Sequence, residues 1–246
     1  MADTRHFIDI DGIKIPIKII VERRSNARVS IGGSNVILRV PKALFFKTDL
    51  GKHIDWATQW LRQLKAQKPT VLDKFKPKRE YKHGQIFSIG EQEFVLNIIT
   101  LPKDTGSIKL KEGNILFIEI PDRQGYDQQK LIKNLLIRFC QKYFLPTLVR
   151  KVNYYNQTYF NKPIKNIKLK YNKTNWGSCS TGKNLNFSVR LFFAPEDVID
   201  YVVVHELAHL VEMNHSDKFW KIVSDIMPNY KQKEHILKIN NGLYDF

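Results

Sequence analysis

The residues with the clearest chemical potential form the pattern His205-Glu206-Leu207-Ala208-His209. Successive residues of an α-helix are rotated by about 100°, so His205 and His209 lie roughly 40° apart on one face and can bind one metal ion together. Glu206 projects from a neighbouring direction, close enough to accept a proton from a water on that metal without being a ligand. The pattern therefore predicts a catalytic metal site carried by a helix.

A third ligand is predicted at His215, ten residues after His205. A continuous helix would place His215 about 280° around from His205, on the wrong face, so the helix has to end first. We expect Asn214 to end it in the left-handed conformation and Ser216 to cap the next helix. Three neutral imidazoles with a water in the fourth position form the open site of a catalytic zinc, and we predict one zinc ion per chain.

These parts predict metal-assisted hydrolysis of a peptide bond. Zinc lowers the pKa of its bound water to about 7, and Glu206 would take the proton and pass it to the leaving amine. We expect the strand over residues 184–191 to offer a backbone edge along which an extended peptide substrate pairs. The candidate substrate-binding residues are Trp176, Asn186 and Arg190.

Two other functions fit the same residues. Because a zinc-bound hydroxide attacks phosphorus as well as carbon, a phosphohydrolase acting on nucleotides is the first alternative. The second alternative is a nucleic-acid-binding module whose zinc only holds the fold together. Histidine ligands also accept nickel, cobalt or copper, so the residues alone leave the metal open.

The charge of the chain favours an acidic partner. Its 246 residues include 40 Lys and Arg against 24 Asp and Glu, a formal net charge of +16. Such a field concentrates phosphate-bearing molecules near the protein, so nucleic acid or a nucleotide is a candidate partner beside the protein or peptide substrate. The candidate contacts are basic residues in the first third of the chain: Arg23, Arg24, Arg28, Lys76, Lys78 and Arg79.

Composition excludes several classes of protein. With 43% hydrophobic and 12% aromatic residues, the chain can bury enough surface to fold, which excludes wholesale disorder. No stretch reaches the ~18 apolar residues of a membrane-spanning helix, and the charged N-terminus does not resemble a signal peptide. Cys140 and Cys179 lie far apart, which excludes a disulfide scaffold and a cysteine-based zinc ribbon. We expect a cytoplasmic protein without membrane contact, and nothing in the sequence indicates its oligomeric state.

Hydrophobic periodicity predicts the elements of the first half. Residues 7–40 alternate as strands joined by turns, and residues 47–68 have the three- and four-residue spacing of a helix. Two further strand regions are predicted over residues 85–99 and 107–120. The first half is therefore expected to be β-rich with one helix.

The pattern changes near residue 125. We predict three helices, over residues 127–152, 196–212 and 217–226, and two strands, over residues 164–171 and 184–191. Pro146 is expected to kink or break the first of these helices. The result is an α+β protein without an internal repeat, in which residues 1–125 form a β-rich region and residues 126–246 a zincin-like catalytic region.

Several short motifs surround the predicted site. They are Asn-Trp-Gly-Ser-Cys-Ser at residues 175–180, Asn-Leu-Asn-Phe at 184–187, the Ala-Pro start of the segment 194–209, and Asn-His-Ser at 214–216. With them the chain resembles the YgjP-like metallopeptidase family, which is related to the SprT-like and WLM proteases that act on DNA-bound proteins. The resemblance covers roughly residues 15–235, although the family usually has a basic residue in place of Asn175. It implies a zincin-type metallopeptidase and, through that kinship, substrates among nucleic-acid-associated proteins.

Overall fold

The computed structural model describes residues 6–42, 50–68, 71–75, 79–123, 125, 127–240 and 242–246. Contacts divide the chain into two compact units, Met1–Lys78 and Arg79–Phe246. Both combine sheets with helices, which confirms the predicted α+β class. The boundary expected at residue 125 falls inside the second unit, because residues on both sides of it share one hydrophobic core. None of the described helices is both long and apolar enough to cross a membrane.

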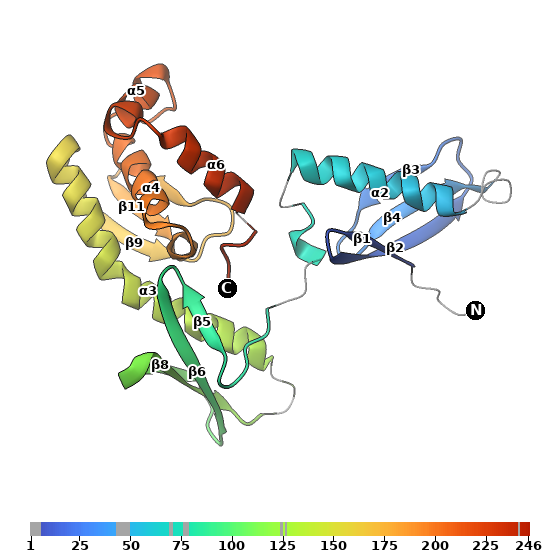
Figure 1. The fold of residues 1–246 in the computed structure, drawn as a ribbon, viewed down its shortest axis with the longest axis horizontal. Coiled ribbons are helices and arrows are strands. Elements are labelled where there is room, and N and C mark those ends of the chain that lie inside the picture. The colour runs from blue at the N-terminus through green and yellow to red at the C-terminus, as the bar shows by residue number, and fades with distance from the viewer. Residues whose placement is uncertain are drawn as a thin grey trace. The chain divides into compact units, whose positions relative to one another are not determined.

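The first unit is a four-stranded sheet covered by one helix (Figure 1). Alternate residues of β4 and of the first half of β2 are buried, and α2 (Leu50–Gln67) closes this core with Ala57 and Leu61. The predicted strands and helix are confirmed, whereas the expected helix start at residue 47 lies outside the described residues. The strands are β1 (His6–Ile10), β2 (Ile13–Glu22), β3 (Arg28–Ile31) and β4 (Val36–Pro41), and a short 3-10 turn, η1 (Asp73–Phe75), follows the helix.

The second unit begins with the same arrangement of four strands followed by a helix. The spatial orders are β1-β2-β4-β3 and β5-β6-β8-β7, each with a parallel central pair and two antiparallel outer pairs. In both copies the last strand ends at a proline, Pro41 opposite Glu22 and Pro121 opposite Leu101. The expectation of no internal repeat is therefore wrong, because what repeats is strand order and alternation rather than side-chain identity. The strands are β5 (Ile86–Ile89), β6 (Gln92–Leu101), β7 (Ser107–Lys111) and β8 (Ile115–Pro121), with the turn η2 (Glu112–Asn114) before the last.

Each strand region predicted between residues 85 and 120 consists of two strands. Gly90 separates β5 from β6, and Gly113 lies between β7 and β8. Their φ angles of 60° and 71° are in the left-handed region that favours glycine, so each glycine allows the chain to turn there.

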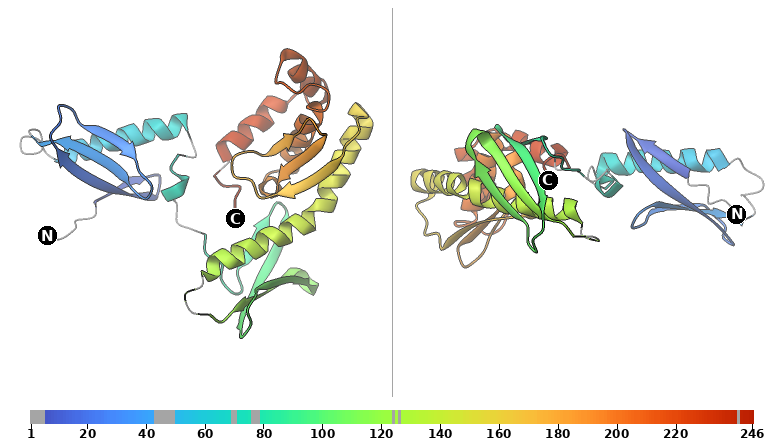
Figure 2. Two further views of the ribbon diagram at one scale, coloured as in Figure 1. Left: turned by 180° about the vertical axis from the view of Figure 1, so that it is seen from behind. Right: turned by 90° about the horizontal axis from the view of Figure 1, so that it is seen from below.

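A single long helix, α3 (Gln128–Tyr155), joins this sheet to the rest of the unit (Figure 2). The helix continues through Pro146, so the proline does not break it into two helices. Toward its N-terminal half, Phe139 packs edge-on against Phe94 of β6. Further along, Phe144 stacks on Phe192 and Gln141 donates to the Leu169 carbonyl at 3.1 Å. The helix therefore packs against both sheets of the unit.

The remaining elements form a small sheet and three helices. The sheet has the order β10-β11-β9, with β11 in the centre. α4 packs against α3, α5, α6 and β10, and its burial on all sides explains its almost uniformly apolar sequence. α6 was not predicted, since Leu237 is its only fully buried residue. The elements are η3 (Asn156–Phe160), β9 (Asn166–Lys170), β10 (Gly177–Cys179), β11 (Asn184–Ser188), η4 (Val189–Phe193), α4 (Glu196–Ala208), α5 (Asp217–Ile226) and α6 (Tyr230–Asn240).

Candidate active site

The helix that carries the histidine motif ends early. α4 stops at Ala208, four residues before the expected end at Glu212, and the Val211 and Glu212 N–H groups both donate to the Ala208 carbonyl, at 3.0 and 2.9 Å. Asn214 does not adopt the left-handed conformation, so that expectation is wrong. Ser216 occupies the N-cap position of α5 as predicted, but its side chain makes no capping hydrogen bond. The turn between the helices thus returns the chain toward His205.

Three histidine side chains converge at this turn. The Nε2 atoms of His205 and His215 are 3.0 Å apart, and one ligand nitrogen from each of His205, His209 and His215 lies within 4.8 Å of the others. Two nitrogens bound at ~2.0–2.1 Å to a tetrahedral ion would be roughly 3.3 Å apart. The fully buried ring of Phe219 lies beneath all three imidazoles, with centroid distances of 4.9, 4.5 and 4.7 Å. The cluster has the size of a metal site.

The protonation of His205 and His209 also suits a metal. Burial, with a smaller contribution from the neighbouring imidazoles, lowers the pKa of His205 to about 3. Burial likewise lowers the pKa of His209. The Nδ1 atom of His209 is 3.2 Å from the Glu212 carbonyl, so an Nδ1–H can donate there and leave Nε2 free. Neutral imidazole is the form that binds metal, and the donor set therefore fits the group that the sequence predicts.

Glu206 is buried beside this cluster with one oxygen unused. The residue is 4% exposed, and burial raises the pKa of its carboxyl group to about 8. No described residue forms a hydrogen bond with its Oε2 atom. A buried polar atom without a partner costs about 1–3 kcal/mol. Such an atom is typical of a site that water, an ion or substrate completes.

Gly177 sets the space available to Glu206. A Cβ atom on this glycine would lie 2.6 Å from the Glu206 Cγ atom and 2.7 Å from its Cδ atom, closer than real side chains approach. Its φ angle is not positive, so close approach rather than backbone conformation requires a glycine here. Residue spacing assigns Gly177 no role, and the surrounding Trp-Gly-Ser-Cys motif is the only signal for it in the sequence.

Cys179 lies two residues further along β10. Burial, and then the negative charge of Glu206, raise the pKa of its thiol to about 11. Because the thiolate is the nucleophilic form, this cysteine is a poor nucleophile. Its surroundings give it a structural role.

Aromatic rings continue from the cluster into a groove. Trp220 stacks on His215 with centroids 5.6 Å apart, and Tyr230 stacks on Trp220 at 5.2 Å. The groove has a volume of about 350 Å³. It offers both flat apolar surface and charged groups next to the histidines. Its lining consists of Trp220, Tyr230, Lys231, Glu234, His235 and Lys238.

The edges of the small sheet are β10 and β9 rather than the predicted strand, and β10 is the edge that packs against α4. β11 pairs with β10 on one side and β9 on the other, so the edge expected at residues 184–191 does not exist. Ser188 N–H donates to Trp176 O at 2.8 Å and Ser180 N–H to Asn184 O at 3.1 Å. In an antiparallel pair, hydrogen-bonded positions alternate with positions whose N–H and C=O groups point away from the partner strand. Gly177 and Cys179 occupy the second kind of position, so their N–H and C=O groups face away from β11.

The other predicted substrate-binding residues have different surroundings. Asn186 lies on β11 opposite Ser178 and donates to its hydroxyl at 3.3 Å. Trp176 packs on the guanidinium of Arg190, 4.7 Å from ring centre to carbon. Arg190 is only 4% exposed, and its donors bind backbone carbonyls. The structure therefore packs the partly buried Trp176 ring on the buried guanidinium of Arg190.

The predicted nucleic-acid contacts belong to both units. Arg23 and Arg28 are exposed in the first unit, where Arg24 forms an ion pair with Glu22 at 2.7 Å. In the second unit Arg79 donates to the Asp245 carbonyl at 3.0 Å. The remaining two, Lys76 and Lys78, lie outside the described residues.

Comparison with known proteins gives a match over most of the chain. A family model described as YgjP-like, metallopeptidase domain, matches residues 25–240. Similar solved structures include the metallopeptidase zymogen abylysin of Pyrococcus abyssi, with 21% identity and a TM-score of 0.34 over 37% of this chain and 91% of that one. The zymogen jannalysin of Methanocaldococcus jannaschii shows 27% identity and a TM-score of 0.34 over 39% and 96%. No curated protein matches the chain.

Proposed function

Because this chain belongs to the YgjP-like metallopeptidase family, and so to the metal-dependent peptidases, we propose that it hydrolyses peptide bonds with Glu206 as proton acceptor. In this proposal zinc is held by His205, His209 and His215. The observation that carries it is the juxtaposition of three imidazoles, with ligand nitrogens within 4.8 Å, and a buried Glu206 oxygen that has no hydrogen-bond partner in the part of the chain that the structure describes. Bound zinc would supply a Lewis acid that activates water and polarises the scissile carbonyl.

Glu206 would carry the proton between the two reacting groups. Its carboxyl group is packed against Gly177, and Oε2 is the atom without a partner among the described residues. A carboxylate held in this way takes a proton from the attacking water at Oε2 and returns it to the leaving amine. Burial supports this role, because it raises the pKa of Glu206 from 4.5 to about 8, near neutrality, where the carboxyl group can both take up and release a proton.

The substrate would lie along β10 as an additional strand. The backbone groups of Gly177 and Cys179 face away from β11, and Gly177 contacts Glu206 directly. A peptide paired there passes beside the proton acceptor, and main-chain hydrogen bonds hold it without demanding a particular sequence. Side chains next to the cleaved bond could then reach the groove lined by Trp220 and Tyr230.

We also propose that nucleic acid brings this peptidase to its protein substrates. The net charge of +16 and the exposed Arg23 and Arg28 support this proposal. The resemblance of the sequence motifs to a family related to SprT-like and WLM proteases is a further reason for this proposal.

Metal content and cleavage, measured together, test the proposed chemistry. We expect one zinc per chain in the wild type and in Glu206→Gln, and loss of zinc in His209→Ala. Cleavage of an unfolded protein should disappear in both variants, while His83→Ala, which changes a histidine bonded to the Ile98 carbonyl, should keep zinc and activity. Phosphate release from nucleoside triphosphates that depends on Glu206, without any peptide cleavage, would show that the enzyme is a phosphohydrolase instead.

A further inference from the structure

A buried arginine joins the loop before β10 to the segment that follows α6. The Nε atom of Arg190 donates to the Tyr244 carbonyl at 2.7 Å. Its Nη1 atom donates to the Lys173 carbonyl at 2.9 Å and lies 3.4 Å from the Asn172 carbonyl. A guanidinium that is 4% exposed is costly to bury unless its donors are used, and here they connect two backbone segments.

The loop at residues 172–176 is held by side chain and backbone together. The Trp176 ring lies over the guanidinium of Arg190 at 4.7 Å and meets the Tyr244 ring edge-on at 6.2 Å. Ser188 contributes two bonds, from its hydroxyl to the Asn172 carbonyl at 2.9 Å and from its N–H to the Trp176 carbonyl at 2.8 Å. The end of the loop at Trp176 is therefore fixed on several sides.

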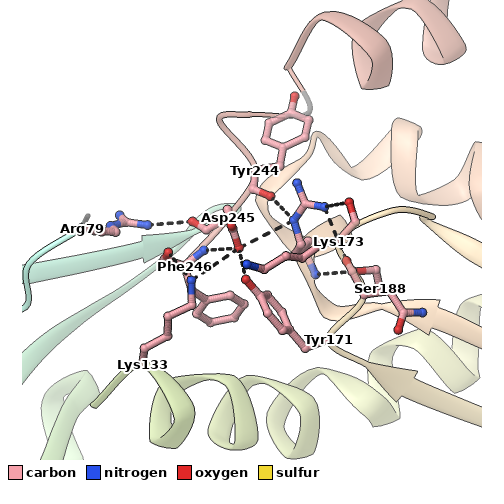
Figure 3. Close-up of polar contacts among 10 residues, drawn as sticks. Arg79, Lys133, Tyr171, Lys173, Ser188, Tyr244, Asp245 and Phe246 are labelled. Carbon is pink, nitrogen blue, oxygen red and sulfur yellow. Dashed lines mark hydrogen bonds and ion pairs between the residues drawn. The ribbon is translucent and has the colours of Figure 1, made fainter. Parts of the chain in front are cut away.

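The segment on the other side of Arg190 is itself anchored (Figure 3). Asp245 accepts a hydrogen bond from the Tyr171 hydroxyl at 2.6 Å and lies 3.7 Å from the Arg190 Nε atom. Phe246 is buried, with its ring 5.0 Å from that of Phe193. Arg190 is thus bonded to an anchored segment, and its bonds to the Asn172 and Lys173 carbonyls hold the loop against that segment.

The loop ends at the residue that touches the proton acceptor. Gly177 follows Trp176 directly, and its backbone is in contact with the side chain of Glu206. We propose that Arg190 is a positioning residue for Glu206, acting through Trp176 and Gly177. The inference rests on the proposed role of Glu206 in proton transfer. Arg190 is too deeply buried to touch the substrate, yet it would affect the rate of the reaction.

Replacement of Arg190 by lysine tests this role while the positive charge is kept. An ammonium group cannot bind carbonyls on two segments in the planar geometry of guanidinium, nor cover the Trp176 ring in the same way. In the zinc-loaded full-length enzyme we expect kcat to fall about 10-fold or more, with KM within about twofold and zinc content unchanged, as for other groups that orient a catalytic side chain. Ser188→Ala removes the hydroxyl bond to the Asn172 carbonyl and the longer bond, at 3.4 Å, that the same hydroxyl accepts from the Arg190 N–H. It leaves the Arg190 guanidinium in place and should lower kcat by a smaller factor in the same direction.

Lys133→Gln is the matched control. Lys133 donates to the Phe246 carbonyl at 3.0 Å and so anchors the same C-terminal segment without a bond to the loop. It should leave kcat nearly unchanged. If Lys133→Gln lowers kcat as much as Arg190→Lys does, or if Arg190→Lys loses zinc or leaves kcat intact, the proposed route through Trp176 is wrong.

Amide hydrogen exchange gives a readout that needs no peptidase activity. We expect Arg190→Lys to speed exchange in a peptide covering residues 172–180, and not in one covering β6. Unchanged exchange at residues 172–180 would overturn the inference even in an active enzyme. Faster exchange in a protein that cleaves no peptide would uphold the positioning contact and refute the proposed function instead.

Discussion

At the scale of single residues, the contact between Gly177 and Glu206 predicts that one added methyl group at Gly177 lowers the rate of peptide cleavage. Gly177→Ala adds one methyl group where Glu206 Cγ would be 2.6 Å away, so either the carboxylate or β10 has to move. We expect a loss of about 100-fold in kcat, the size associated with a displacement of roughly 1 Å in a catalytic group, while zinc content stays the same. The measurement is steady-state cleavage alongside elemental analysis.

A second glycine supplies the control for that experiment. A Cβ atom on Gly33 would meet nothing within 4 Å, and its φ angle is not positive. Gly33→Ala should therefore leave cleavage unchanged. Full activity of Gly177→Ala would show that the close contact does not govern the reaction.

The burial of Glu206 predicts how the stability of the metal-free protein depends on pH. Its pKa rises from 4.5 to about 8 on folding, so between these values the folded state keeps a proton that the unfolded state releases. Metal-free protein should lose stability as pH rises through this window. Glu206→Gln removes the effect, so this variant should match the wild type near pH 4 and exceed its free energy of unfolding by a few kcal/mol above pH 8.

Urea unfolding in the presence of a chelator measures this difference. The contribution of His205, whose pKa is lowered to about 3, is the same in both proteins and cancels in the comparison. Parallel curves of stability against pH for the two proteins would contradict the assignment of the buried carboxyl.

The sequence was sufficient to predict which residues converge, but not what surrounds them. The spacing of His205 and His209 fixes their direction on any helix, and His215 required only that the helix end before it. Gly177 and Phe219 touch the site through packing between distant segments. No periodicity within one segment encodes such contacts, so neither residue could be assigned a role.

At the scale of elements, alternation predicted strands but not their neighbours. Residues 184–191 have the alternating polar and apolar pattern of a strand, but only Asn184–Ser188 form β11 and the 3-10 turn η4 follows it, so the predicted strand is three residues too long. Alternation indicates which face of a strand is buried, and it does not indicate that β11 occupies the centre of its sheet. Its pairing with β9 is parallel and needs partners far apart in sequence, which local patterns do not specify. The helices with broad apolar faces were predicted, whereas α6, with one fully buried residue, was not.

The edge position of β10 yields a prediction about substrate binding. Proline at position 179 would remove an N–H that faces away from β11, so the sheet should tolerate it while an incoming peptide loses a hydrogen bond. We expect Cys179→Pro to raise KM several-fold relative to Cys179→Ala, which also removes the thiol but keeps the N–H. Comparable KM values in the two variants would show that the substrate does not pair with β10.

At the scale of the whole molecule, the net charge of +16 either contributes to nucleic-acid binding or has no functional consequence. The salt dependence of binding distinguishes these two cases. Replacement of Arg23 and Arg28 by alanine should weaken the binding of single-stranded DNA and lower the slope of log K against log salt concentration by about 1–2. Fluorescence anisotropy of a labelled oligonucleotide measures both. Replacement of Lys142 and Lys168, two exposed lysines of the second unit, is the control, and an equal loss there would mean that the binding is not localised to the first unit.

The repeated module differs between its two copies in the length of its helix. α2 has 18 residues and α3 has 28, an extension of about 15 Å at 1.5 Å per residue. The far part of α3 carries Lys151, whose ammonium group bonds Asp200 and Glu196 of α4 at 2.8 and 2.7 Å. From Phe139, which packs on β6, to Lys151 the helix spans about 18 Å, so a tilt of about 5° at the sheet would move the turn that carries Lys151 by roughly 1.6 Å. A ligand or mutation that shifts this sheet would therefore displace α4, the helix that carries the histidine motif, through the ion pairs of Lys151.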